Sequence, residues 1–144
     1  NMKMLFSENY EAAVRAGDSV PKVLIKLGQW HILKGINWGR SYTLGNFVME
    51  LANFKGTQSF NMNISLVNEG GEYWSLTDYP DFDPISRAGD PSRWVVVDLR
   101  PIRSYIHAGR ITGLASELER AIFGFDAVLL VGGGTRASFE LTTQ

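Results

Sequence analysis

The chain has 144 residues, of which 44% are hydrophobic and 20% are charged, with a formal net charge of -1 at pH 7. This length and composition are typical of a globular protein with a hydrophobic core, and we interpret residues 1–144 as one domain. The scattered Lys and Arg residues argue against a nucleic-acid partner. No apolar run approaches the ~20 residues that span a bilayer, so we expect no membrane association.

The absence of cysteine excludes disulfides, thiolate nucleophiles and cysteine-based metal sites. The N-terminal stretch, with Glu8 and Glu11, lacks the apolar core of a signal peptide. These features leave the compartment open, with the cytoplasm favoured. The chain begins on Asn1 rather than Met, which is consistent with a C-terminal fragment of a longer protein.

The first third of the chain predicts a helix and a strand. Apolar side chains at helical spacing predict an amphipathic helix over residues 2–14. The run Val23-Leu24-Ile25, bounded by Pro21 and Gly28, predicts a buried central strand at about 22–27. Residues 28–42 follow no period, so we expect an irregular connection there.

The middle of the chain predicts a helix followed by an amphipathic strand. Thr43 is a candidate N-cap for a helix that runs to Phe54 and is ended by Gly56. Residues 60–66 then alternate with a period of two, which is typical of a strand. We expect its apolar face to be buried (Phe60, Met62, Ile64, Leu66) and its polar face to line a cleft or solvent (Asn61, Asn63, Ser65).

Residues 68–92 lack a sustained period and predict a lid or a surface arm, with a short hairpin around residues 72–76. The last part predicts four elements: a buried strand from Trp94 to Val97 that ends at Asp98, a helix from Pro101 to about His107, a helix after Thr112 that ends at Gly124, and a buried strand from Ala127 to Val131. This order predicts an α/β fold, a mostly parallel sheet of about four strands with helices on its faces, either whole or as an incomplete half of a larger domain.

Ligands of parallel sheets bind at the carboxyl ends of strands, where the predicted strand at 22–27 would place His31 after a turn at Gly28. An imidazole there could act as a general base or a metal ligand. Asp98 is the better candidate for its carboxylate partner because it would share the same edge, and Glu50 is the second candidate. Structural roles are the competing interpretation: loop hydrogen bonds for His31, and a helix cap or an ion pair with Arg100 or Arg103 for Asp98.

The segment from Pro21 to His31, together with Leu44-Gly-Asn-Phe-Val-Met-Glu-Leu51 and Val97-Asp-Leu-Arg-Pro101, resembles the C-terminal part of erythromycin esterase-like proteins, which are grouped with the Tiki, TraB and ChaN proteins. Their Gly-x-x-His signature is matched by Gly28-Gln-Trp-His31. The resemblance implies an α/β fold whose active centre gathers two histidine signatures and a glutamate pair, the first histidine and the acids coming from an earlier half of the chain.

Three functional hypotheses follow. The resemblance implies a hydrolase-like domain that cleaves an ester, lactone or peptide bond only when the missing half is supplied, with His31 as base or as ligand of a divalent metal and Asp98 orienting it. The isolated chain would then be inactive. Alternatively, the chain is a non-catalytic module in which Asn61 and Asn63 frame a small-molecule pocket or a protein interface. A third hypothesis is a homo-oligomer that forms through an open sheet edge or an exposed apolar face.

Overall fold

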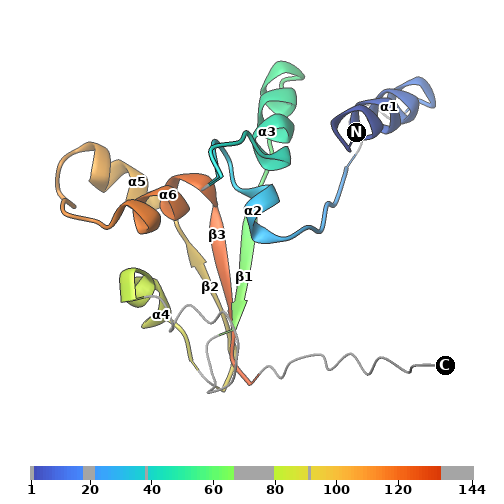
Figure 1. Cartoon of the computed structure of the whole chain (residues 1–144). Helices are drawn as coiled ribbons and strands as arrows, with labels where there is room; N and C mark the ends of the chain where they lie inside the picture. Colours follow the sequence, from blue (N-terminus) through green and yellow to red (C-terminus); the bar gives the residue numbers. More distant parts are fainter. Residues whose placement is uncertain (1, 18–21, 38, 67–79, 91, 134–144) are drawn as a thin grey trace. The chain divides into compact units, whose positions relative to one another are not determined.

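The structure is a computed structural model and describes residues 2–17, 22–37, 39–66, 80–90 and 92–133. It is a mixed α/β chain that divides into two compact units, residues 1–61 and residues 62–144. The helices and strands labelled in Figure 1 are, in chain order, α1 (Met2–Arg15), α2 (Gln29–Ile32), α3 (Leu44–Phe54), β1 (Met62–Leu66), α4 (Asp83–Ser86), β2 (Trp94–Asp98), α5 (Arg100–His107), α6 (Ser116–Gly124) and β3 (Ala127–Val131). A short 3₁₀ helix (Pro80–Phe82) directly precedes α4.

The two longer helices of the first unit form where the sequence predicts them. The backbone N–H of Asn46 donates to the Thr43 hydroxyl at 3.0 Å, which confirms Thr43 as the N-cap of α3. Beyond the last turn, Gly56 has a φ of 68°, a left-handed conformation that suits glycine at a helix end. α1 packs against α3 through the rings of Phe6 and Phe47, whose centroids lie 6.2 Å apart edge to face.

The predicted strand at residues 22–27 is wrong. These residues have no regular secondary structure, and the side chain of Leu24 is 97% exposed. A strand needs a neighbour to complete its backbone hydrogen bonds, and no strand within the described residues pairs with this segment. Residues 28–42 are mostly irregular, as expected, apart from the single turn of α2 and an isolated bridge between Ile36 and Tyr42.

A close approach of backbone to backbone holds α3 against the end of α2. A Cβ atom on Gly45 would lie 2.0 Å from the backbone oxygen of Ile32, so only glycine fits there. Asn61 donates from its side-chain amide to the same Ile32 oxygen, and the Thr43 hydroxyl donates to the backbone oxygen of Leu33, a fully buried residue. The buried polar groups of this unit therefore stabilise an otherwise irregular loop.

The second unit is built on a three-stranded sheet of described residues, in the order β1-β3-β2 (Figure 1). β1 pairs parallel with β3, whereas β2 pairs antiparallel, and Ile64, Leu129 and Val96 lie side by side across the three strands. The expected mostly parallel sheet of about four strands is therefore not what these residues form. The reason is that the local pattern of a strand carries its period but not its direction.

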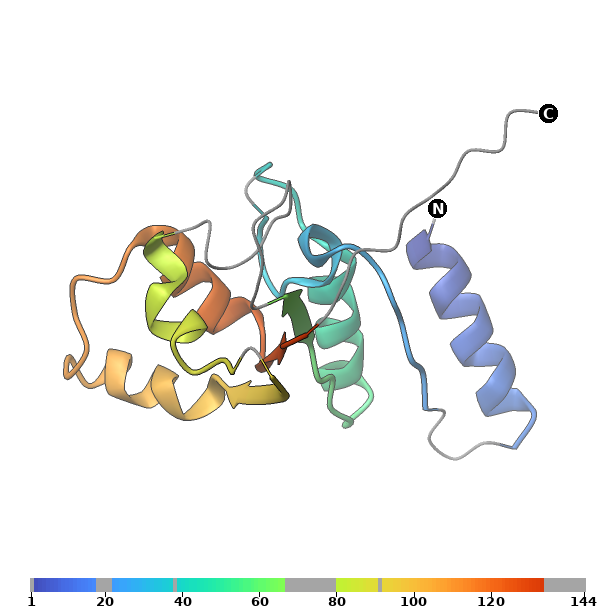
Figure 2. The ribbon, with the colours of Figure 1, turned by 90° about the horizontal axis from the view of Figure 1, so that it is seen from below.

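The sheet has two unlike faces, because paired residues of neighbouring strands point to the same side. We call the side that carries Asn63, Ser65, Val128 and Leu130 the covered face, since all four are buried. α4, α5 and α6 lie to one side of the strands (Figure 2). The core of the unit comes from this face and from the helices, and includes Ile85, Leu118, Ala121, Ile122, Val128 and Leu130.

We call the opposite side the open face; it carries Ile64, Val96 and Trp94. The orientation predicted for β1 is therefore wrong, because Asn61, Asn63 and Ser65 are buried and Ile64 is exposed. Alternation reveals two different faces but not which of them is covered. Burial is tolerable for Asn63 because its amide donates to the Ser65 hydroxyl at 3.2 Å. β2, which was expected to be fully buried, is likewise open on one side.

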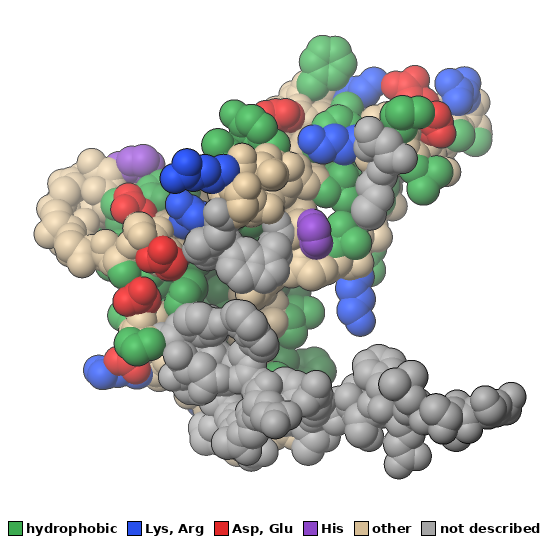
Figure 3. All heavy atoms as spheres, in the orientation of Figure 1, with side chains coloured by type: hydrophobic (Ala, Val, Ile, Leu, Met, Phe, Trp, Pro, Cys, Tyr) green, Lys and Arg blue, Asp and Glu red, His purple; other side chains and the backbone are tan. Residues whose placement is uncertain are grey.

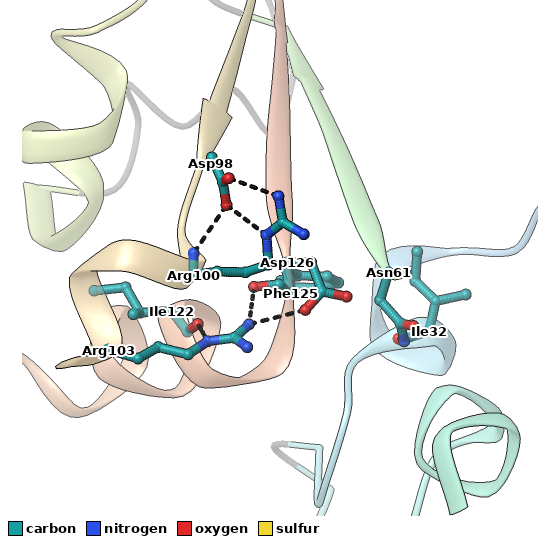
Figure 4. Close-up of polar contacts among 8 residues, drawn as sticks. All are labelled: Ile32, Asn61, Asp98, Arg100, Arg103, Ile122, Phe125 and Asp126. Carbon is teal, nitrogen blue, oxygen red and sulfur yellow. Dashed lines mark hydrogen bonds and ion pairs between the residues drawn. The ribbon is translucent and has the colours of Figure 1, made fainter. Parts of the chain in front are cut away.

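α5 and α6 are joined by one arginine. α5 confirms the helix predicted from Pro101 to His107, while α6 begins at Ser116 rather than directly after Thr112. The Arg103 guanidinium donates to the backbone oxygens of Ile122 and Phe125 at 2.8 and 2.6 Å and lies 3.3 Å from the Asp126 carboxylate (Figure 4). It thereby satisfies carbonyl groups that the end of α6 leaves without helical partners.

The hairpin expected around residues 72–76 lies outside the described residues. The remainder of that predicted arm contains the short 3₁₀ helix and α4. Among the described residues, no helix combines the length and the apolar character needed to cross a membrane.

Candidate functional site

His31 lies on the single turn of α2 rather than at the end of a strand. Its side chain is exposed, in agreement with the surface positions of the histidines in Figure 3, and its backbone N–H donates to the Gly28 oxygen at 2.9 Å. The ring packs beside Gly28, since a Cβ built on that glycine would lie 3.8 Å from His31 Cδ2. The imidazole is therefore accessible to solvent and to any molecule that approaches this turn.

The premise that Gly28 forms a tight turn after a strand is wrong. Its φ and ψ are -59° and 144°, a conformation open to any residue. An added Cβ would make only ordinary van der Waals contact there. The backbone geometry therefore does not require glycine at this position, and a binding role for Gly28 as part of the Gly-x-x-His match stays a prediction.

Glu50, the second candidate partner of His31, and Asn61, predicted to frame a pocket or interface, have hydrogen-bond partners inside the first unit. The Asn46 amide donates to Glu50 Oε1 at 2.9 Å, while the Asn46 amide oxygen accepts the backbone N–H of Gly35, also at 2.9 Å. Asn61 is buried and donates to Ile32 (Figure 4). These contacts anchor the loop between α2 and α3. Asn63, the other predicted binding residue, is buried in the second unit against Ser65.

Asp98 ends β2 and is tied to Arg100 (Figure 4). Its carboxylate accepts the Arg100 Nε–H at 2.9 Å, the Nη2–H at 2.7 Å and the backbone N–H at 3.0 Å. The Arg100 side-chain hydrogen bond, followed by its backbone hydrogen bond, lowers the pKa of Asp98 to about 2. Of the interpretations considered for this residue, the ion pair with Arg100 is therefore the one observed.

His31 and Asp98 were expected to lie together at the carboxyl edge of one parallel sheet, and this prediction is wrong. Because β2 is antiparallel to β3, Asp98 lies beside Ala127, at the start of β3 rather than at its carboxyl end. The two residues also belong to different units, each of which is described by itself. Within the described part of the chain, no three His, Asp or Glu side chains are grouped as a metal site would require.

The sequence suggested an exposed apolar face as one hypothesis but did not locate it, and the structure places it on the open face of the sheet. Ile64, Val96 and Trp94 are 59%, 63% and 69% exposed, and they project from the same side of two different strands. At one end of β2, Asp98 lies on the same side as Trp94 and Val96, and its charge is matched by Arg100 at 2.7 Å. The result is an apolar surface whose carboxylate at that end is paired.

One pattern in the sequence indicated part of the open face. The alternation in residues 60–66 separates Ile64 from Asn63 and Ser65 correctly. In Trp94-Val95-Val96-Val97, however, apolar residues occupy both sides of the strand, so the period of two is hidden.

No protein-family model, curated protein or solved structure matches this chain.

Proposed function

We propose that this chain is a protein-interaction module whose open face binds the apolar side of an amphipathic helix. The exposure of Ile64, Val96 and Trp94 on one side of the sheet carries the proposal. Contiguous apolar patches on soluble proteins commonly mark interaction sites, whereas singly scattered apolar residues do not.

The chemistry of the sheet supports an apolar ligand on this side. In β1 the polar side chains of Asn63 and Ser65 are buried, whereas the apolar side chain of Ile64 is exposed. A strand with one solvent-exposed face usually has the opposite arrangement, with polar side chains facing the water. The Asp98–Arg100 pair at the end of β2 provides no net charge that would select an acidic or a basic ligand.

The size of the sheet favours a helix over a larger surface. Strands lie about 4.8 Å apart, so three strands give a platform of roughly 14 Å, and a helix with its side chains is roughly 10 Å across. In α/β proteins, helices commonly cover both sides of a sheet. Here the described helices of the unit lie on one side (Figure 2), and a helix of the partner would supply the second layer.

Calorimetric titration with a synthetic amphipathic helix tests this function. The peptide carries leucines along one side and uncharged polar residues along the other. We expect binding with a negative heat-capacity change, because apolar surface leaves water. The variant Ile64→Lys should lower the affinity at least about tenfold, since it places a charge in the contact.

Leu5→Lys provides the matched control, because Leu5 is 60% exposed but belongs to α1 in the other unit. It should bind like the unmodified chain. Undetectable binding to the unmodified chain, or equal losses in the two variants, would contradict the proposal.

A second proposal is the hydrolase-like function that the resemblance implies, which would need the missing half of the catalytic centre. Its support is the exposure of the His31 ring beside Gly28. The test is hydrolysis of p-nitrophenyl acetate by the full-length protein with and without His31→Ala. Equal turnover by the two proteins would remove His31 from any such role.

A further inference from the structure

The hydrogen bonds of β2 reveal which of its backbone groups face away from the sheet. Leu99 N–H donates to the Asp126 oxygen at 2.9 Å, and Gly132 N–H donates to the Arg93 oxygen at 3.1 Å. In an antiparallel ladder, every second residue exchanges hydrogen bonds with the same partner strand. Residues 93, 95, 97 and 99 therefore bond toward β3, and the N–H and C=O groups of Trp94, Val96 and Asp98 point outward.

No strand among the described residues pairs with this outer edge of β2. Between Trp94 and Asp98 the strand contains no proline, no lysine and no bulge in its register with β3, three features that commonly protect an edge. Tryptophan and valine are strong strand formers, so an added strand would find a regular, β-prone template.

We infer that two copies of this chain pair antiparallel through their β2 edges, with the two-fold axis at Val96. In this register, Val96 lies opposite the Val96 of the second copy, and Trp94 lies opposite its Asp98. Because Trp94, Val96 and Asp98 all direct their backbone groups outward, every one of these groups gains a partner. The inference concerns a strand edge and does not depend on helix binding at the open face.

A cation–π contact favours a second copy over an unrelated strand. The register places the indole of Trp94 beside the Asp98–Arg100 ion pair of the other copy. Asp98 holds the Arg100 guanidinium through two hydrogen bonds, and this side chain is still 56% exposed. A fixed, partly exposed guanidinium is a good partner for the face of an indole ring. The two-fold axis repeats this contact at both ends of the paired strands.

The pairing also preserves the two faces of the sheet. A two-fold axis perpendicular to the sheet keeps Ile64, Val96 and Trp94 of both copies on the same side. The combined sheet has the order β1-β3-β2-β2-β3-β1, with one continuous open face. Each remaining outer edge is then the edge of a β1 strand.

Sedimentation velocity of the whole chain over a concentration series tests this inference. The unmodified protein should shift from monomer to dimer as its concentration rises. Val96→Lys should raise the dimer dissociation constant at least about tenfold, because the axis places the two lysines opposite each other. Val96→Pro should act similarly: it removes an outward N–H without removing a bond to β3. Circular dichroism verifies that each variant is folded.

Ile64→Lys is the control, because it places the same charge on the open face but on β1, away from the paired edges. It should dimerise like the unmodified chain, even though it is expected to lose the synthetic helix. Loss of the dimer in both lysine variants would indicate association through the open face and would overturn edge pairing. A monomer at all concentrations would overturn it as well.

Discussion

Position 45 requires glycine because the backbone of Ile32 lies too close for any side chain. An added Cβ would lie 2.0 Å from Ile32 O and 2.4 Å from Ile32 C, and backbone atoms cannot rotate away as a flexible side chain can. Alanine is a better helix former than glycine by about 1 kcal/mol, but overpacking typically costs about 1–3 kcal/mol. The steric effect should therefore prevail, and the loop between α2 and α3 should move away from the helix.

We expect Gly45→Ala to lower the free energy of unfolding by about 1–2 kcal/mol, with faster amide hydrogen exchange in α3. Gly28→Ala is the control, because its nearest contact would be 3.8 Å away and its φ is negative. This control should retain normal stability. Equal stability of the Gly45 and Gly28 variants would show that the α2–α3 contact is looser than described.

The Asp98–Arg100 pair gives the second unit a defined acid response. The pKa of Asp98 is lowered from its ordinary 3.8 to about 2 by the hydrogen bonds of Arg100. A carboxyl group with a lowered pKa stabilises the folded state above its unfolded pKa, and that contribution disappears as the pH falls through the folded pKa. The window in which this ion pair weakens thus lies between about pH 4 and about pH 2.

Carbon-detected NMR titration of the Asp98 carboxyl group should give a midpoint near pH 2 in the unmodified chain. Arg100→Gln should raise the pKa of Asp98 toward its ordinary value, because the strongest hydrogen bonds are lost. Arg93→Gln, which removes the partner of Asp90 instead, should leave Asp98 unchanged. A low midpoint that survives Arg100→Gln would assign the shift to another group.

In the candidate site, the type of a residue alone did not predict which hydrogen-bond partners its side chain would have. The sequence correctly indicated that Asp98 has an arginine partner in reach, because residues two positions apart at a strand end can meet. It could not indicate that Asn61 would donate to the backbone oxygen of Ile32, because these two residues meet only when the chain folds. The contact of Glu50 with Asn46 is local, since the two residues lie four positions apart on α3.

At the scale of elements, Arg103 links α5 to the end of α6. Its guanidinium satisfies two backbone oxygens and faces Asp126, whose side chain is only 5% exposed. Removing such a group leaves buried carbonyl groups and a buried carboxylate with fewer donors, which is more costly than losing an exposed pair. The effect should thus exceed that of any exposed arginine.

Arg103→Gln should lower the free energy of unfolding by about 2–4 kcal/mol in urea denaturation. The exposed Arg110 stacks on Tyr105 with its guanidinium carbon 6.0 Å from the ring, and Arg110→Gln should cost under about 1 kcal/mol. Similar losses in the two variants would mean that Arg103 does not anchor α6.

The sequence predicted most elements because local patterns determine them. The Thr43 cap, the Gly56 stop and the apolar spacing between them define α3 without any knowledge of the rest of the chain. Residues 22–27 fail for the opposite reason, since Val23-Leu24-Ile25 has the composition of a strand but no described partner. Strand direction is likewise a property of the whole sheet. The antiparallel course of β2 could not be predicted from Trp94 to Asp98 alone.

At the scale of the whole molecule, the open face raises the question of whether its side chains stabilise the isolated chain. If Ile64 projects into solvent, replacing it with another β-branched residue changes neither the core nor the preference for a strand. Leu130 is fully buried on the covered face, and truncating it would leave a cavity. The two positions therefore distinguish an exposed surface of the sheet from the surface that holds the fold.

We expect Ile64→Thr to change the free energy of unfolding by less than about 1 kcal/mol, and Leu130→Ala to lower it by about 2–5 kcal/mol. Urea denaturation of the whole chain measures both values. Ile64→Thr should also reduce binding of an apolar dye, because it removes part of the exposed patch. Comparable destabilisation by the two variants would mean that another part of the same chain covers Ile64, and the open face would then belong to the core instead of to a partner.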